Sequence, residues 1–440
     1  MASSLSRTPS GSGNQRTWTY SGWFKFCTTD QNLFLLSAGA YGDSKSMQLL
    51  IANSGNFLQF QGFSSGGSAD FNCETNAELR DIGAWYHIMV ACDTTQSTAS
   101  DRAKIYINGE LQTLRTSTYP SQNYDTGVNT AIAHEINDRP GASLEQTLYS
   151  THVHMTDGTA YAASTFGETD STSGIWKPKT APSVTYGTNG FFLKMENSGA
   201  MGTDSSGNSN TFTVNGTITQ AEDTPSNNFA TFNPLKDGRI NSGTQYKATF
   251  SNGNTTSTFS ESTYNTGAFS SLAVMGGKWY AEIKCSNKGG NTKLGLFSAD
   301  DYGSDDFSGT YLYDSSGTFG GASYGSSFTT GDIIQIAFDS TNGNLWFGKN
   351  GTWQNSATQS EIEAGTTTNA AATGISTTEF WHFGTYGVNA TAFQANFGNG
   401  RYGTTALSSS NSDGAGLGLF EYSVPSGYYS LCTKNIKDYG

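Results

Sequence analysis

The sequence predicts an all-β protein that folds as two β-sandwich domains in tandem. Apolar and polar residues alternate with a period of two along much of the chain, and a sustained 3.6-residue period is nearly absent. The 27 Phe, 22 Tyr and 8 Trp can fill a core, which argues against disorder, and the 53 Gly supply turns. A length of 440 residues fits two large β domains or about three average ones.

The strands expected in the first half are separated by recognisable turns. Residues 17–26 alternate as a strand, and residues 47–60 read as a strand, a turn and a second strand. Residues 85–92 form a continuous apolar run, which is typical of a central sandwich strand. Residues 104–113 contain Asn108-Gly109, a pair that favours a type I′ hairpin because both positions tolerate a positive φ.

The second half repeats this order of elements. Residues 277–284 alternate, residues 332–338 form a second central-strand run, and residues 344–353 contain a hairpin signal at Asn350-Gly351. In both halves an apolar strand, an aspartate, a polar turn and a strand lead to Asn-Gly. We therefore expect two sandwiches of similar design, not a solenoid of short repeats.

Composition sets the expected domain boundaries. We expect a first sandwich over residues 1–180, an ordered junction over 181–235 and a second sandwich with a C-terminal extension over 236–440. The junction is rich in Ser, Thr, Asn and Gly, yet it is more aromatic than a flexible tether would be. Its phenylalanines are Phe191, Phe192, Phe212, Phe229 and Phe232.

Charge and cysteine content exclude several classes of protein. A net charge of −13 and a pI near 4.8 argue against nucleic acid as a partner. No apolar run approaches the roughly 18 residues of a membrane span, and the first ten residues lack the apolar region of a secretory signal. The five cysteines are scattered without zinc-site spacing, so we expect small buried thiols in a reducing compartment.

Two family resemblances agree with this architecture. The first part resembles the concanavalin A-like lectin/laminin-G jelly-roll superfamily, and the residues that carry the resemblance are 18–23, 85–90 and 101–109. The second part resembles a SPRY domain, and the residues that carry that resemblance are 277–282, 294–296 and 331–351. Together they cover most of residues 14–405 and imply a concanavalin A-like jelly roll followed by a SPRY-like sandwich.

A third resemblance concerns the combination of the two parts. Four segments are similar to large lectin-like proteins of bacteriophages, notably marine ones, namely residues 5–9, 166–170, 176–178 and 224–231. This resemblance implies a virion surface protein, made in the host cytoplasm, that serves as a tail fibre, head fibre or capsid decoration. It also implies other virion structural proteins as partners and a homo-oligomeric state.

Carbohydrate binding is the function that the residues favour most. Sugars need a flat aromatic face together with short polar side chains that satisfy hydroxyl groups. The candidates for such a host-glycan site lie among Asn, Asp, Ser and Gly, and they are Tyr302, Tyr311, Tyr313, Tyr324, Trp353 and Tyr386. Several of these aromatics could instead be core or interface residues.

Enzymatic activity is less well supported, and we assign no catalytic residue. Retaining glycoside hydrolysis needs two carboxyl groups about 5–5.5 Å apart. The nearest matches, Glu168 with Asp170 and Glu361 with Glu363, lack a flanking strand that would hold them rigidly. A virion-borne polysaccharide depolymerase stays an alternative, as does a purely structural decoration protein without a ligand.

Metal binding is weakly indicated. His152 and His154 would share one strand face, but no third ligand accompanies them. The loops at 300–306 and 204–208 carry the oxygen ligands that Ca²⁺ prefers, although Asp and Asn also populate turns for their own backbone bonds. We therefore predict no cofactor and assign no metal ligand, and we keep Ca²⁺ as the alternative.

Overall fold

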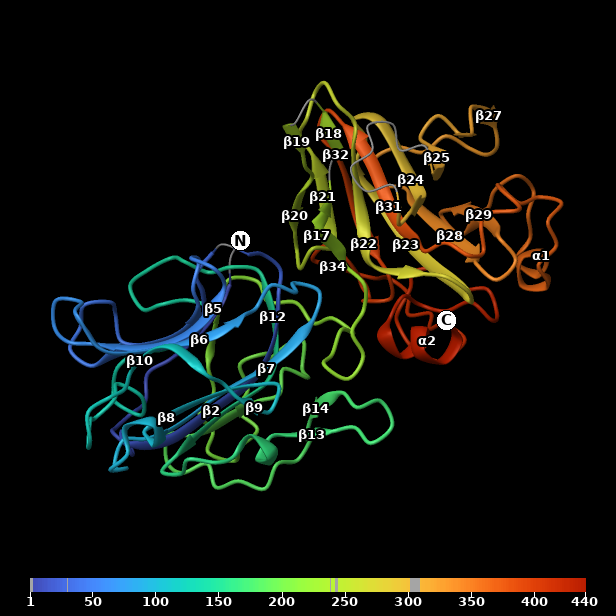
Figure 1. Ribbon diagram of the computed structural model, residues 1–440. Coiled ribbons are helices and arrows are strands. Elements are labelled where there is room, and N and C mark those ends of the chain that lie inside the picture. Colours follow the sequence, from blue (N-terminus) through green and yellow to red (C-terminus); the bar gives the residue numbers. More distant parts are fainter. Residues whose placement is uncertain (1–2, 30, 238, 242–243, 301–308) are drawn as a thin grey trace. The chain divides into compact units, whose positions relative to one another are not determined.

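The computed structural model describes residues 3–29, 31–237, 239–241, 244–300 and 309–440 (Figure 1). The chain divides into two compact units, Met1–Gln220 (unit 1) and Ala221–Gly440 (unit 2). Each unit is built mainly from two antiparallel sheets. The predicted all-β fold class, with two sandwich-like units in tandem, is confirmed.

The larger sheet of unit 1 has eight strands in the order β10-β6-β5-β4-β3-β11-β1-β16. Every neighbouring pair in it is antiparallel. The strands are β1 (Ser4–Arg7), β3 (Leu33–Ala38), β4 (Ser46–Ile51), β5 (Phe57–Phe63), β6 (Ala69–Glu78), β10 (Leu114–Thr118), β11 (His134–Ile136) and β16 (Thr213–Asn215).

The second sheet of unit 1 has six strands in the order β15-β12-β2-β7-β8-β9. They are β2 (Thr17–Phe26), β7 (Trp85–Asp93), β8 (Ala103–Ile107), β9 (Glu110–Leu111), β12 (Leu148–Asp157) and β15 (Phe191–Leu193). A separate hairpin, β13 (Gly167–Thr169) with β14 (Trp176–Pro178), and two 3-10 turns, Ala99–Asp101 and Ala163–Thr165, complete the unit. The predicted hairpin turn is confirmed, since Asn108 and Gly109 have φ values of 50° and 84°.

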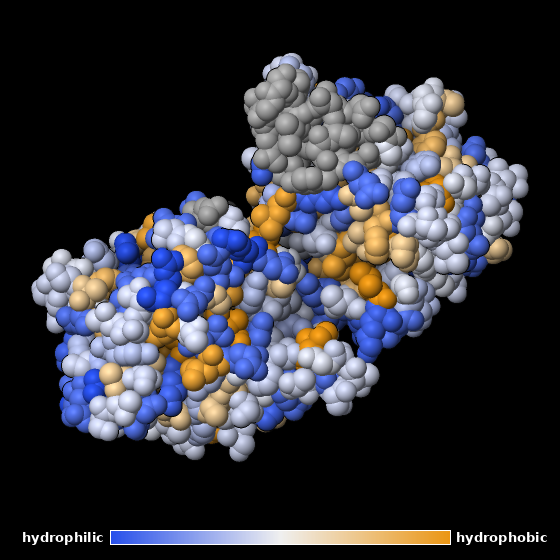
Figure 2. All heavy atoms as spheres, viewed as in Figure 1, coloured by the Kyte–Doolittle hydropathy of each residue, from blue (hydrophilic) through white to orange (hydrophobic). Residues whose placement is uncertain are grey.

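The core of unit 1 lies between these two sheets. Alternate residues of both sheets enter it, for example Leu49 and Phe60 from one sheet and Tyr20 and Val90 from the other. Burying one such side chain contributes about 1.5–3 kcal/mol. In Figure 2, apolar side chains form small groups among polar ones on the visible face of this unit.

Unit 2 has two seven-stranded sheets. One has the order β17-β22-β31-β24-β25-β26-β27, with β17 (Phe232–Asp237), β22 (Thr266–Val274), β24 (Gly290–Ser298), β25 (Thr310–Asp314), β26 (Thr318–Phe319), β27 (Ala322–Ser323) and β31 (Trp381–Val388). The other has the order β20-β21-β32-β23-β28-β29-β30, with β20 (Thr249–Ser251), β21 (Thr256–Phe259), β23 (Lys278–Asn287), β28 (Ile333–Asp339), β29 (Asn344–Lys349), β30 (Thr352–Trp353) and β32 (Thr391–Asn396).

Smaller elements complete unit 2. They are the pairs β18 (Arg239–Asn241) with β19 (Thr244–Tyr246) and β33 (Arg401–Tyr402) with β34 (Thr405–Ala406), and the helices α1 (Gln359–Ala364) and α2 (Thr433–Tyr439). Neither helix reaches the length and apolar character of a membrane span, a statement that covers only the described residues. The C-terminal segment packs Phe420 and Tyr428 against Tyr280 and Trp346, which are strand residues of the second sheet.

The boundary between the units differs from the expected one. β15 pairs with β12 and β16 pairs with β1, so the chain up to Gln220 belongs to unit 1. Phe229 and Phe232, by contrast, are buried in unit 2. The segment 181–235, expected as a separate junction, is therefore divided between both units, because its phenylalanines complete two different cores.

All five cysteines are buried free thiols, as the sequence predicts. Burial raises the pKa of the Cys73 thiol to about 12, since a thiolate would lose its hydration there. These side chains therefore pack as small apolar groups and are poor nucleophiles.

Candidate functional site

The aromatic residues predicted to bind glycans do not gather in one place. Tyr302 lies outside the described residues. Tyr313 and Tyr324 are core residues of unit 2, with ring centroids 5.6 Å apart, and burial raises the pKa of both hydroxyls to about 12. Their rings have no free face for a sugar, so the structure corrects this part of the prediction.

The other three predicted aromatics lie apart from each other. Trp353 is 9% exposed and belongs to the cluster around Tyr280 on the second sheet of unit 2. Tyr311 packs edge-on against Trp381, with centroids 5.4 Å apart, whereas Tyr386 packs with the separate Phe269 cluster. The sequence of a strand does not tell which face of the sheet a tyrosine occupies. Here Tyr313 enters the main core of unit 2, whereas Tyr386 packs with a separate cluster.

The candidate catalytic acids have structural partners. Asp170 accepts a hydrogen bond from Lys177 Nζ at 2.9 Å and others from the backbone of its own turn, and these contacts lower its pKa. Glu168 lies 3.8 Å from the same ammonium group. Glu361 forms a capping box with Thr358 at the start of α1, and Glu363 accepts from the backbone of Ser426.

The two histidines considered as a metal pair both lie beside the Phe192 ring, with centroids 5.6 Å away for His152 and 3.9 Å away for His154, but no third ligand joins them among the described residues. A bulge in β12 lies between Thr151 and His154, and His152 has a φ of 48°. His154 is buried, stacks on Phe192 at 3.9 Å, and contacts Tyr186 Oη at 3.0 Å through Nδ1. Burial lowers the pKa of His154, which keeps the imidazole neutral.

Of the two loops considered for Ca²⁺, the one at 204–208 is held by its own hydrogen bonds. Asp204 accepts hydrogen bonds from the backbone of Phe192, Ser206 and Asn210, so its carboxylate organises its own turn. The loop at 300–306 falls almost wholly outside the described residues. Within the described ranges, no group of three His, Cys, Asp or Glu residues is placed to hold a metal ion.

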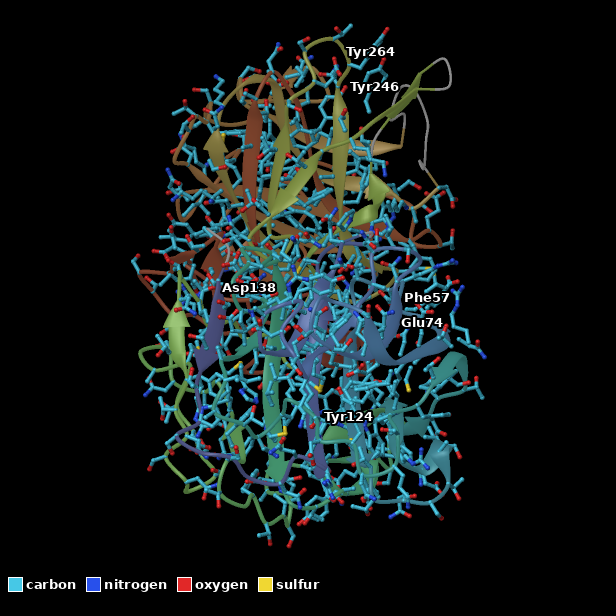
Figure 3. The ribbon with its side chains drawn as sticks, turned by 90° about the vertical axis from the view of Figure 1, so that its left-hand side faces the viewer. Phe57, Glu74, Tyr124, Asp138, Tyr246 and Tyr264 are labelled. Carbon is cyan, nitrogen blue, oxygen red and sulfur yellow. The ribbon has the colours of Figure 1, made fainter. Side chains whose placement is uncertain are left out.

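A partly exposed aromatic pair is present in unit 2. The rings of Tyr246 and Tyr264 lie 4.7 Å apart at an angle of 43° (Figure 3). The pair offers ring surface, whereas an organised set of polar side chains lies on unit 1.

That set crosses the outer face of the eight-stranded sheet. Consecutive strands pair so that seven polar residues stand opposite one another in a single line, which we call the polar row. Its members are Ser6, Glu135, Ser37, Gln48, Gln61, Asn72 and Thr118. Their strand neighbours, such as Leu36, Leu49 and Phe60, enter the core. Because successive side chains alternate between faces, the row lies on the face turned away from the core.

A second line of polar residues runs beside one end of the polar row. Gln59, Glu74 and Thr116 are cross-strand partners on β5, β6 and β10. Thr116 Oγ1 donates to Glu74 Oε2 at 3.1 Å, and Gln59 Nε2 donates across to Asn72 Oδ1 at 3.0 Å. These bonds hold the side chains in place while leaving them partly exposed.

A cation–π pair borders this end of the face. The Arg115 guanidinium lies 4.0 Å from the centroid of the Phe57 ring and 3.5 Å from Glu74 Oε2. Figure 3 shows Phe57 and Glu74 close together. The polar face therefore ends, on this side, at an aromatic ring and a guanidinium group.

The middle of the polar row is recessed. Ser37 and Gln48 are 0% and 3% exposed although they face away from the core. Gln61 Nε2 donates to Gln48 Oε1 at 3.4 Å. Ser37 Oγ and Gln48 Nε2, however, are buried without a hydrogen-bond partner among the described residues.

The far end of the row carries an acid with an altered pKa. Burial raises the pKa of Glu135 to about 7, and the nearby carboxylates of Asp138 and Glu145 add to the shift. Glu135 therefore changes charge near neutral pH. In its protonated form it can donate a hydrogen bond as well as accept one.

This face can bind a hydroxyl-rich polymer through many hydrogen bonds. Carboxamide, hydroxyl and carboxyl groups stand at the strand spacing of about 4.8 Å and offer both donors and acceptors. The sequence contains the signal, since Gln48, Gln59, Gln61, Asn72 and Glu74 occupy the polar positions of alternating strands. The cross-strand register that aligns them is not visible in the sequence.

Comparison with known proteins gives a family match within unit 1. Residues 2–143 match the family model described as the concanavalin A-like lectin/glucanases superfamily. This span includes every residue of the polar row. No curated protein matches the chain at a significant level.

Similar solved structures are remote. The SPRY domain of human HERC1 is 18% identical with a TM-score of 0.27, covering 37% of this chain and 96% of that one. A SAP-like pentraxin from Limulus polyphemus is 14% identical with a TM-score of 0.26, covering 36% and 71%. A candidate carbohydrate-binding protein from Bacteroides ovatus is 15% identical with a TM-score of 0.27, covering 49% and 58%. Scores this low decide neither a function nor the detailed fold of unit 2.

Proposed function

We propose that this protein is a non-catalytic carbohydrate-binding protein and that the polar row of unit 1 is its binding face. The observation that carries the proposal is the line of seven polar side chains, in register across the sheet, within the part of the chain that matches a lectin superfamily. The absence of charge on most of these side chains suits a ligand rich in hydroxyl groups.

The physical basis is a set of shallow hydrogen-bonding contacts. Gln59, Gln61 and Asn72 are partly exposed and can donate and accept at once, as vicinal sugar hydroxyls require. A single site of this kind with millimolar affinity provides about 4 kcal/mol of binding free energy. Several copies on one assembly can raise the avidity roughly 10²–10⁴-fold, so weak single sites are sufficient.

A glycan array with the intact chain, followed by calorimetry on the best ligand, tests this proposal. We expect Gln61→Ala and Asn72→Ala each to weaken binding about 5- to 10-fold, because each removes a neutral hydrogen bond worth about 1 kcal/mol. Gln122→Ala is the matched control, since Gln122 is an exposed amide in a loop away from the row. Unchanged affinity in both row variants, with unchanged folding, would place the binding site elsewhere.

The proposed lack of catalysis rests on the partners of the candidate acids. Lys177 holds Glu168 and Asp170 in an ion pair, and Glu361 caps a helix. We expect no release of reducing ends from any polysaccharide that the protein binds. Release that is lost in Glu168→Gln and Asp170→Asn would support the depolymerase alternative instead.

For the biological setting, we propose display on the surface of a bacteriophage particle, in several copies that pack against other virion proteins. The four segments similar to phage lectin-like proteins, 5–9, 166–170, 176–178 and 224–231, support this proposal. Light scattering of the purified chain measures the expected homo-oligomer. Immunogold labelling of purified particles tests the location, and particles that carry no label would contradict it.

A further inference from the structure

Two hydrogen-bond donors in the middle of the polar row have no acceptor. Ser37 Oγ and Gln48 Nε2 are buried, and neither has a partner among the described residues. Buried polar groups in folded proteins are nearly always hydrogen-bonded, so an unpaired neighbouring pair calls for a ligand or water. Ser37 and Gln48 are direct cross-strand partners, which places both donors at one spot on the outer face.

The Arg139 side chain contacts two aromatic rings that border this part of the face. Its guanidinium carbon is 5.6 Å from the Phe34 ring centroid and 5.1 Å from that of Tyr41. Phe34 precedes Ser37 on the outer face of β3. Tyr41 packs at 5.1 Å on Phe63, which lies on the opposite side of the row. From these two ring contacts we infer that the guanidinium lies across the row near Ser37 and Gln48.

The guanidinium is itself without an acceptor. In the part of the chain that the structure describes, Arg139 uses its backbone amide, which donates to Asp138 Oδ1 at 2.7 Å, but its side chain forms no ion pair or hydrogen bond. Phe34 and Tyr41 contact it only through their rings. Arg139 is partly exposed, so a ligand can reach it from solvent.

We propose that Ser37, Gln48 and Arg139 form a subsite for the carboxylate of an acidic sugar, a hexuronic acid within a polysaccharide. A carboxylate offers two oxygens with about four acceptor positions, and a guanidinium presents a planar fork that matches them. The positive charge of the Arg139 guanidinium disfavours a cationic sugar at this spot. This inference rests on the proposed carbohydrate-binding function and specifies its ligand.

The carboxyl groups near the subsite determine the pH at which a carboxylate ligand is not repelled. Glu135 is the cross-strand partner of Ser37, and Asp138 and Glu145 lie near it. Asp138 Oδ1 is occupied by the backbone amides of Arg139 and Leu144, so it does not compete for the guanidinium fork. A protonated Glu135 would not repel the ligand, and the test is therefore made at about pH 6.

The test compares oligogalacturonate with its fully methyl-esterified form and with a neutral galacto-oligosaccharide of the same length, by calorimetry at low salt. Methylation removes the charge and keeps a carbonyl acceptor. We expect the intact chain to bind oligogalacturonate about 10- to 100-fold more tightly than the other two, as charge-assisted hydrogen bonds predict.

Three variants locate the effect. Arg139→Gln and Gln48→Met should each lose most of the preference for the acid. Gln48→Met should change the melting temperature little, because the amide that it removes has an unpaired buried Nε2 and only one long bond of 3.4 Å at Oε1, from the partly exposed Gln61. Arg80→Gln is the matched control, since it removes one positive charge from an exposed ion pair with Glu78. Its preference should be unchanged.

The outcomes separate the two proposals. Equal binding of the ester and the acid, or full preference in Arg139→Gln, overturns the carboxylate subsite. Binding of the neutral oligosaccharide with no binding of the acid also overturns the subsite but leaves the carbohydrate-binding function intact. Failure to bind any glycan on the array overturns both.

Discussion

The carboxylate of Glu282 is fully buried in unit 2 and accepts four hydrogen bonds. Two come from the hydroxyls of Tyr280 and Tyr402, and two come from the backbone amides of Glu421 and Tyr422. Burial raises its pKa although all four donors act in the opposite direction. The C-terminal segment is thereby tied to strand β23 through one side chain.

Removing one of these donors should destabilise unit 2. In Tyr402→Phe, the bond of 2.6 Å from Tyr402 Oη to Glu282 Oε2 is lost inside the protein. Hydrogen bonds to charged groups are worth about 1.5–3 kcal/mol, so we expect the free energy of unfolding to fall by about 2 kcal/mol in chemical denaturation. Tyr106→Phe is the control, because no described residue hydrogen-bonds to its hydroxyl. Equal stability of the two variants would contradict this role.

Glu135 makes the stability of unit 1 depend on pH. Its pKa is about 7 in the folded protein and 4.5 ordinarily, so between these values the folded chain binds more protons than the unfolded chain. This contribution to stability is present below about pH 4.5 and is lost as the pH rises through 7. The side chain in Glu135→Gln does not titrate, so the variant avoids this loss of stability. We expect its free energy of unfolding to exceed that of the wild type by about 1 kcal/mol at pH 8, after solvent screening, and to equal it at pH 4.5.

Denaturant unfolding at these two pH values measures the difference. Glu110→Gln, a change at an exposed glutamate of β9, is the matched control and should show no such pH dependence. A stabilisation by Glu135→Gln that is the same at both pH values would show that the effect is not one of titration.

At the level of residues, the sequence shows which side-chain types suit a sugar site, but it does not show where in the fold those side chains lie. The aromatic-rich stretch that holds Tyr311, Tyr313 and Tyr324 looks suited to sugars, yet Tyr313 and Tyr324 fill the core of unit 2. The amides of the polar row look like ordinary solvent-facing strand residues. What distinguishes them is the pairing of β3 to β6, a long-range property that no local pattern encodes.

At the level of elements, the local signals were reliable where turn chemistry fixes the backbone. Both Asn-Gly pairs form the expected turns, and Asn350 and Gly351 have φ values of 48° and 84°. The short strands β15 and β16 were missed as parts of unit 1, because three residues give too little periodicity to assign a partner. Their place follows from burial of Phe191 and Phe212 in the core of that unit.

The β13–β14 hairpin is a separate two-stranded element that contacts the six-stranded sheet through Trp176. Trp176 Nε1 donates to His87 Nδ1 at 3.0 Å, and His87 Nε2 in turn contacts Ser21 Oγ at 2.8 Å. The indole also lies against Gly109, where a Cβ would come within 2.9 Å of the ring. Burial lowers the pKa of His87 to about 3.

Trp176→Ala should therefore release the hairpin. We expect amide hydrogen exchange to accelerate in residues 167–178, and we expect the pKa of His87 to rise toward 6.5 as water reaches the ring. Exchange by mass spectrometry and an NMR titration of the imidazole measure the two effects. Ile175→Ala, at an exposed position of the same hairpin, should change neither. An unchanged His87 pKa in Trp176→Ala would show that other residues bury the ring.

At the level of the whole molecule, the division into two units predicts which fragments fold. Each unit has its own core and its own pair of sheets, so residues 1–220 and residues 221–440 should each be stable alone. Family resemblance located the two sandwiches but not this boundary. The motifs that carry a family pattern lie within the central strands, whereas the boundary depends on short peripheral strands.

A fragment that ends at residue 180 should fail to fold stably, although it contains every motif of the first sandwich. It lacks Phe191, Leu193 and Phe212, which are 0–3% exposed in the core of unit 1. Removing one such phenylalanine side chain typically costs about 3–5 kcal/mol, against a total stability of about 5–15 kcal/mol for a domain. Thermal unfolding by circular dichroism should give a cooperative transition for 1–220 and a weak or absent one for 1–180.

The same comparison can be made in unit 2 with the fragments 221–440 and 236–440, since the shorter fragment lacks Phe229 and Phe232. If both short fragments melt at the temperatures of the long ones, the segment between residues 181 and 235 contributes to neither core.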